Sequence, residues 1–143
     1  MRPKIRFLLA FLLLPLLSFA QQGDLNEGPN YHIFSIYFGG GSYYIDAEQE
    51  SELFKWLDEI EGLENHLISI HGHTDNIGSY EYNQMLSKYR CDAALMRLLV
   101  KGIPEDVISI EDFGEFNPIY DNSTWEGKQK NRRVDIIIRP LII

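Results

Sequence analysis

The sequence predicts an α/β (α+β) fold in which a small sheet carries its helices packed on one side. Four short apolar runs typical of strands alternate with segments that have helical apolar spacing, in the order β-α-β-α-β-β. N-cap residues precede the two longest helical segments. The length of 143 residues fits a single domain.

The first twenty residues are typical of a secretory signal peptide rather than of that domain. A basic start is followed by the apolar run 7–17 and by the small-residue stretch Ser18-Phe19-Ala20. The run is too short to cross a bilayer, which needs about 20 apolar residues. We therefore expect a signal peptide at 1–20, a short flexible leader at 21–30, and the domain at 31–143.

Charge and cysteine content narrow the function classes. Loss of Arg2, Lys4 and Arg6 with the signal peptide takes the formal net charge from −8 to −11. This acidic balance argues against nucleic acid as a partner and gives no long-range attraction to anionic membranes. Cys91 is the only cysteine, so the chain forms no intramolecular disulfide, and we expect a buried, inert thiol. No pattern indicates a cofactor, and no transmembrane segment is expected in the mature chain.

The first half of the domain holds two strands and a helix. Residues 33–38 form a strand-like run that ends at three glycines. Asp46, with Gln49 three residues later, is a capping-box variant that begins a helix, and Gly62 can end it. The helix has an apolar face at helical spacing, made by Leu53, Trp56, Leu57 and Ile60. Residues 66–72 form the second strand.

The second half begins with a long helix. Ser79 can cap it, and Gly102, with Pro104 beyond, ends it after Lys101. Residues 107–110 form the third strand, residues 125–130 a short helical piece, and residues 134–138 the last strand.

The stretch HGHTDN, residues 71–76, first suggests a metal site, since His71, His73 and Asp75 alternate along a strand. Metallo-β-lactamase-like hydrolases use the motif HxHxDH, whereas this sequence has HxHxDN, and no histidine follows residue 73. We favour the simpler interpretation that both histidines are strand-end residues bonded to nearby backbone. The run FGGGS at 38–42 lacks the further glycine or the Gly-Lys pair of a phosphate loop, so it indicates a flexible strand exit.

A polar stripe follows this loop along the long helix. At about 100° per residue, Asn83, Ser87 and Arg90 share one narrow face and begin close to Asp75. A carboxylate, a guanidinium and an amide facing one small pocket would suit a zwitterion with an ammonium and a carboxylate close together. Two other interpretations stay open: a structural ion pair between Asp75 and Arg90, or a solvated helix face.

Two longer blocks carry a resemblance to a known family. The blocks are HGHTDNIGSYEYNQMLSKYRCDAALMRLLVKGIP and GEFNPIYDNSTWEGKQKNRRVDI. They resemble the OmpA-like peptidoglycan-binding domain, which reads GHTDxxG…YNxxLSxxRA…GI and then GExxP…N…EGRxxNRRVEI. The resemblance covers about residues 33–138 and implies a mixed sheet with helices packed against it.

The resemblance also implies a ligand and its contacts. Family members hold peptidoglycan non-covalently through the meso-diaminopimelate of the stem peptide. By motif position, Asp75 takes the ammonium and Arg90 the carboxylate, while Thr74 and Asn83 line the same pocket. Asn131 and Arg132 match a neighbouring block, for which a structural role is better supported than a ligand contact.

Two departures from the family pattern bear on binding. Gly39 stands where the family carries an aspartate in its first strand, which removes a carboxylate near the pocket. Trp125 stands where the family has a small residue, and is either a packing residue or an exposed platform over the ligand.

The sequence therefore predicts a non-enzymatic, exported protein of the periplasm, associated with the cell wall or outer membrane, that binds peptidoglycan stem peptides. The alternative is a protein–protein adaptor of the cell envelope with the same fold and with weakened or lost wall binding. An envelope protein partner stays open under both interpretations.

Overall fold

A computed structural model describes residues 30–142 of the chain. The predicted signal peptide and all but the last residue of the predicted leader lie outside the described residues. The elements in chain order are β1 (His32–Tyr37), α1 (Ala47–Asp58), η1 (Leu63–Asn65), β2 (His66–His73), α2 (Tyr80–Val100), η2 (Glu105–Val107), β3 (Ile108–Gly114), α3 (Trp125–Asn131) and β4 (Arg133–Pro140). This confirms the predicted order, with α3 as the short helical piece before the last strand.

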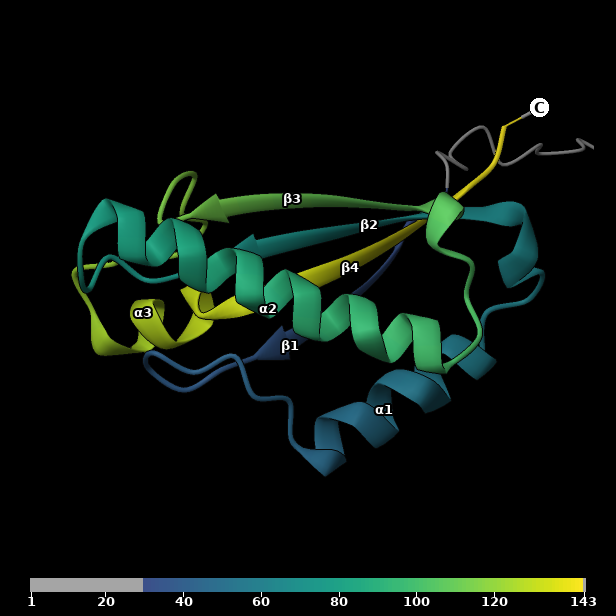
Figure 1. Cartoon of the computed structure of the whole chain (residues 1–143), viewed down its shortest axis with the longest axis horizontal. Helices are drawn as coiled ribbons and strands as arrows, with labels where there is room; N and C mark the ends of the chain where they lie inside the picture. Colours follow the sequence, from purple (N-terminus) through teal and green to yellow (C-terminus); the bar gives the residue numbers. More distant parts are fainter. Residues whose placement is uncertain (1–29, 143) are drawn as a thin grey trace, which may run out of the picture.

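The four strands form one mixed sheet in the order β1-β4-β2-β3 (Figure 1). The last strand, β4, lies between β1 and β2 and is antiparallel to both, while β2 and β3 are parallel. The register pairs Gly72 with Val134 and Tyr37 with Arg133. Consequently the ends of β1 and β2 and the start of β4 meet at one edge of the molecule.

Both long helices cover the same face of the sheet (Figure 1). Alternate side chains of the strands point toward them, because successive residues of a strand face opposite sides. The core consists of these strand residues with apolar residues of α1 and α2, among them Ile36, Ile70, Ile136, Leu57 and Leu98. The predicted arrangement of helices on one side is confirmed.

The helix boundaries follow the predicted capping chemistry. The Asp46 carboxylate accepts from the Gln49 N–H at 2.9 Å, and the Ser79 hydroxyl accepts from the Tyr82 N–H at 3.2 Å. Gly102 follows α2 with a positive φ of 94°, a conformation that glycine adopts without steric cost. These local signals set where both helices begin and where α2 ends. The expected stop of the first helix at Gly62 is wrong, since α1 ends at Asp58 and Gly62 instead precedes η1 with a φ of 64°.

The third strand is longer than the predicted range 107–110, since β3 runs from Ile108 to Gly114. Its second half begins with the charged residues Glu111 and Asp112, which an edge strand accommodates because their side chains reach solvent. Backbone pairing with β2 continues to Gly114 regardless of this polarity. The extra residues bring Gly114 beside the loop that carries Asp75.

Candidate functional site

A cavity of about 320 Å³ lies where the ends of β1 and β2 meet the first turns of α2. Four of the six predicted site residues line it: Asp75, Asn83, Arg90 and Arg132. Gly40, Gly41, Ile77, Gly78, Tyr82, Leu86 and Trp125 complete the wall. The polar stripe of α2 is buried rather than solvated, with Asn83 1% and Arg90 0% exposed.

Arg90 is held in the cavity wall by three backbone carbonyls. Its Nε donates to Ser42 O at 2.8 Å, its Nη1 to His73 O at 2.8 Å, and its Nη2 to Gly39 O at 3.1 Å. The guanidinium also lies over the Phe38 ring, 5.0 Å from its centroid. A guanidinium has five N–H donors, so two remain for a ligand.

Burial lowers the pKa of Arg90 to about 10, although the nearby Asp75 carboxylate acts in the opposite direction. The side chain therefore stays protonated near neutral pH and presents a positive charge in a poorly solvated site. An anion that reaches this cavity interacts with Arg90 more strongly than it would in water.

Asp75 forms its ion pair with Arg132 and not with Arg90. Its Oδ2 lies 3.2 Å from Arg132 Nη1, and its Oδ1 accepts from the Ile77 N–H at 3.0 Å. A carboxylate offers about four lone-pair positions, so roughly two remain free to receive an ammonium. Arg132 is itself fixed, because its Nε donates to Phe38 O at 3.0 Å.

Asn83 contributes an acceptor with no partner in the structure. Its Nδ2 donates to Glu115 Oε2 at 2.7 Å, which fixes the amide orientation, and its buried Oδ1 has no hydrogen bond. An unsatisfied buried acceptor costs about 1–3 kcal/mol unless a ligand or a water completes it. Asn83 and Asp75 therefore form the acceptor side of the cavity, and Arg90 and Arg132 form the donor side.

The other two predicted site residues lie outside the cavity lining. The Thr74 hydroxyl donates to Asp75 O at 2.8 Å and so holds the loop that presents Asp75. Asn131 donates to Tyr120 O and accepts from the Tyr120 N–H, which joins α3 to the preceding loop. Both are positioned to support the site rather than to touch a ligand.

The two histidines lie on the sheet face opposite the helices. The expected bond to nearby backbone is wrong for His73, whose buried Nδ1 has no hydrogen-bond partner. His73 stacks on Phe113 with ring centroids 5.1 Å apart, and His71 meets the same ring edge-on. Asp75 points into the cavity, so the three residues do not converge. Among residues 30–142, no cluster of three or more histidine, cysteine, aspartate or glutamate side chains could hold a metal ion.

Sequence reasoning missed the role of the glycine run after β1. Gly40 and Gly41 line the cavity, and the carbonyls of Gly39 and Ser42 hold Arg90. Gly41 has a φ of 65°, and a Cβ there would lie 3.0 Å from the Tyr82 hydroxyl. The three glycines were the available signal, but the backbone they shape holds an arginine rather than a phosphate.

Trp125 is exposed and is not packed in the core. Its side chain is 67% exposed at the mouth of the cavity, with the Arg132 guanidinium 5.5 Å from its ring centroid. Cys91, by contrast, is buried, and burial raises the pKa of its thiol to about 12, so the thiol is unreactive.

A mixed sheet with its helices on one face and a charged pocket at the strand ends define a class of protein, and comparison with known proteins gives its family. The family model of the OmpA family matches residues 37–132. The chain belongs to the OmpA family.

Individual proteins in this family show the same likeness. The chain is 36% identical to the peptidoglycan-binding protein ArfA of Mycobacterium tuberculosis over 104 residues, which are 72% of this chain and 32% of ArfA. It is 39% identical to the probable lipoprotein YiaD of Escherichia coli over 74 residues, which are 52% of this chain and 34% of YiaD. The matched region is thus about a third of either relative.

Solved structures agree with the fold. The crystal structure of the peptidoglycan-associated lipoprotein from Burkholderia pseudomallei superposes with a TM-score of 0.67 at 25% identity, over 73% of this chain and 88% of that one. No helix of the described residues is long and apolar enough to cross a membrane. By name, ArfA binds peptidoglycan, the Burkholderia protein is a peptidoglycan-associated lipoprotein, and YiaD is a probable lipoprotein.

Proposed function

We propose that this chain binds peptidoglycan non-covalently in the periplasm and recognises the meso-diaminopimelate zwitterion of the stem peptide. The observation that carries the proposal is the division of one buried cavity into an acceptor side, Asp75 and Asn83, and a donor side, Arg90 and Arg132. The ligand ammonium binds the Asp75 carboxylate and the free Asn83 Oδ1. The ligand carboxylate binds the N–H groups that Arg90 keeps free of the backbone.

The strength of this binding follows from the contacts. Charge-assisted hydrogen bonds contribute about 1.5–3 kcal/mol each. Two such pairs, less the cost of immobilising the ligand, correspond to roughly micromolar to millimolar affinity for one site. Firm attachment to a wall then depends on the many stem peptides that a sacculus presents.

The proposed role of the site is to bind a ligand without making or breaking a covalent bond. Asp75 is ion-paired and Arg90 is held by carbonyls, so neither is placed as a proton-transfer group. We infer an exported, non-enzymatic protein whose partner is the cell wall.

Co-sedimentation with purified sacculi tests the proposal. The wild-type protein should pellet with walls that contain diaminopimelate, and much less with walls that contain lysine, which lacks the second carboxylate. Asp75→Asn keeps the side-chain shape and should reduce pelleting at least tenfold. Arg90→Lys should do the same, since a point charge does not reproduce the planar fork.

Asp92→Asn is the matched control, because Asp92 lies on the exposed face of α2 and pairs only with Lys88. It should pellet like the wild type, and circular dichroism should show that every variant is folded. If the folded wild type stays in the supernatant, wall binding is wrong and the adaptor interpretation gains support. If the wild-type protein pellets equally with both wall types, the diaminopimelate assignment is wrong.

A further inference from the structure

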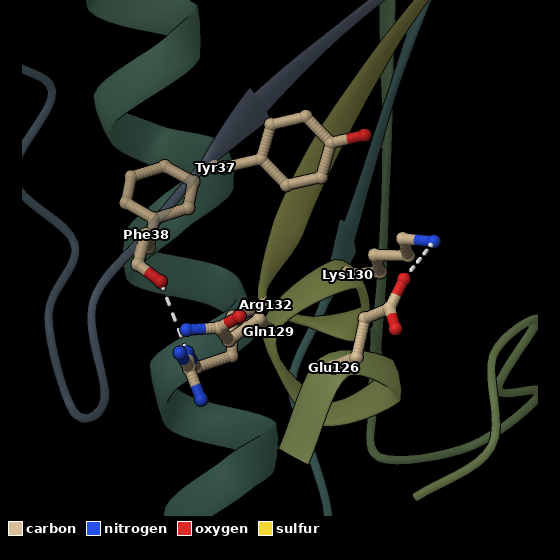
Figure 2. A pocket seen from close by; sticks show the side chains of 6 residues that line it. All are labelled: Tyr37, Phe38, Glu126, Gln129, Lys130 and Arg132. Atoms are coloured by element: carbon tan, nitrogen blue, oxygen red, sulfur yellow. Dashed lines mark hydrogen bonds and ion pairs between the residues drawn. The ribbon is translucent and has the colours of Figure 1, made fainter. Parts of the chain in front are cut away.

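A second cavity of about 320 Å³ lies beside the zwitterion pocket. Figure 2 shows Tyr37 and Phe38 from the end of β1 on one side, and Glu126 and Lys130 of α3 on the other. Gln129 and Arg132 complete its lining. Because Arg132 lines both cavities and bridges Phe38 O and the Asp75 carboxylate, the two spaces share one side chain as a wall.

Trp125 extends this surface between the two cavities. It stands four residues before Gln129 on α3, so the two side chains are neighbours on one helix face. Trp125 lines the mouth of the first cavity and Gln129 lines the second. The exposed Trp125 indole and the Gln129 amide are therefore adjacent on the surface that joins the two cavities.

The side chains on this surface, an aromatic ring beside several polar groups, suit a sugar ring. Aromatic rings offer a flat apolar surface against which the C–H face of a pyranose packs. The Gln129 amide, the Glu126 carboxylate and the Lys130 ammonium supply donors and acceptors for hydroxyl and N-acetyl groups. Glu126 and Lys130 pair with each other at 2.9 Å, and each keeps further hydrogen-bonding positions. A purely apolar ligand would cover these positions and the Gln129 amide without replacing their contacts with water.

We propose that Trp125 and the second cavity form a saccharide subsite that holds an amino-sugar ring of the glycan strand. The inference rests on the proposed function, since the sugar is the one to which the bound stem peptide is attached. An extended peptide spans about 3.3–3.6 Å per residue, so a few stem residues connect the zwitterion in the first cavity to a sugar in an adjacent one.

Calorimetry with two soluble fragments tests the subsite. One fragment is the stem peptide that contains diaminopimelate, and the other is the same peptide attached to its disaccharide. The wild type should bind the disaccharide-peptide about tenfold more tightly than the glycan-free peptide, which is a difference of about 1.4 kcal/mol.

Variants separate the two cavities. Tyr37→Ala and Gln129→Ala alter residues that line only the second cavity, and should remove the tenfold gain without changing affinity for the glycan-free peptide. Trp125→Ala should lower affinity for the disaccharide-peptide more than for the glycan-free peptide. Tyr44→Ala, an exposed tyrosine outside both linings, is the control and should keep the gain.

The outcomes are distinguishable. Equal binding of both fragments by the wild type, or a gain that survives Tyr37→Ala, Gln129→Ala and Trp125→Ala, overturns the saccharide subsite alone. If neither fragment binds the folded wild type, the proposed function fails and the subsite with it. Asp75→Asn should weaken the binding of both fragments equally, because both need the zwitterion pocket.

Discussion

Arg90 is part of the fold as well as a candidate ligand residue. Its side chain is fully buried, and its three nitrogens donate to carbonyls of three residues on two separate loops or strand ends. Truncation would leave the buried His73 carbonyl without a donor, at a cost of about 1–3 kcal/mol, and would free the partly buried carbonyls of Gly39 and Ser42. A loss of binding in Arg90→Ala would therefore be ambiguous, whereas Asp75→Asn and Arg90→Lys preserve more of the packing.

Gly39 leaves room for the carboxylate that the family pattern carries at this position. A Cβ at Gly39 would meet only the Ser42 Cβ, at 3.8 Å, which is an ordinary contact. The Gly39 carbonyl already accepts from Arg90, so the backbone replaces part of the interaction that an acidic side chain could offer. The departure thus changes the charge beside the pocket without disturbing its shape.

His73 makes the stability of the protein depend on pH. Burial lowers its pKa to about 4 from 6.5, Arg133 acts in the same direction, and Asp135 on the same strand as Arg133 opposes them. The folded state therefore resists protonation that the unfolded state accepts below pH 6.5. The free energy of unfolding should fall as pH decreases from about 6.5 to about 4, by on the order of 3 kcal/mol from this residue.

Urea unfolding of wild type and His73→Gln at several pH values measures this effect. The difference in stability between the two proteins should shrink as pH falls through that window, because glutamine does not titrate. A constant difference between wild type and His73→Gln across the window would show that His73 does not titrate as inferred.

At the scale of elements, α2 can approach β2 closely because Gly72 has no side chain. A Cβ on Gly72 would lie 2.5 Å from Cys91 Sγ and 2.6 Å from Ser87 O. These contacts are too short, and one of them is to backbone, so α2 would have to move away from the sheet. Since α2 carries Asn83 and Arg90, and β2 leads into Asp75, the close approach also sets the width of the pocket.

Gly72→Ala should therefore lower the free energy of unfolding by about 1–3 kcal/mol, as overpacked cores do. Urea denaturation measures the change, and sacculus pelleting should fall in the same variant because the two sides of the pocket separate. Gly40→Ala is the matched control for the unfolding measurement alone, since a Cβ there meets nothing within 4 Å but Gly40 itself lines the pocket. Equal stability of Gly72→Ala and wild type would mean that the helix does not depend on this contact.

The elements were predictable because their signals are local. Asp46, Ser79 and Gly102 mark helix ends through hydrogen bonds and backbone conformations within a few residues. The second half of β3 was not, because its pairing with β2 depends on a partner more than 30 residues away and its side chains are polar.

The candidate site was predictable only in part, for the same physical reason. Asp75, Asn83 and Arg90 lie within one strand–loop–helix unit, so helical geometry alone relates the latter two. The pairing of Asp75 with Arg132, 57 residues away, depends on β4 being inserted beside β2. Spacing along the chain carries no information on that insertion, so the resemblance to the family was the sole pointer to Arg132.

At the scale of the whole molecule, the site and the described chain end lie at opposite ends. The pocket is formed where β1 and β2 end and β4 begins, whereas the C terminus emerges at the far end of the sheet (Figure 1). The pocket thus combines segments from both halves of the sequence, and its shape depends on the complete sheet. Loss of the pairing between β2 and β4 would separate Arg132 from Asp75.

The overall charge predicts how wall binding responds to salt. The chain has a formal net charge of −8, and stem peptides are themselves rich in carboxylates, so the long-range interaction between them is repulsive. The contacts that we propose are buried, with Asp75 and Arg132 each 8% exposed at the side chain, and buried pairs are screened only weakly.

Raising NaCl from about 0.1 M to about 1 M shortens the screening length from about 10 Å to about 3 Å and reduces the repulsion. The fraction of wild-type protein that pellets with sacculi should therefore stay constant or rise over this range, while Asp75→Asn stays in the supernatant throughout. A steep fall in wild-type pelleting would instead indicate adsorption through exposed basic side chains, and would contradict recognition within the buried pocket.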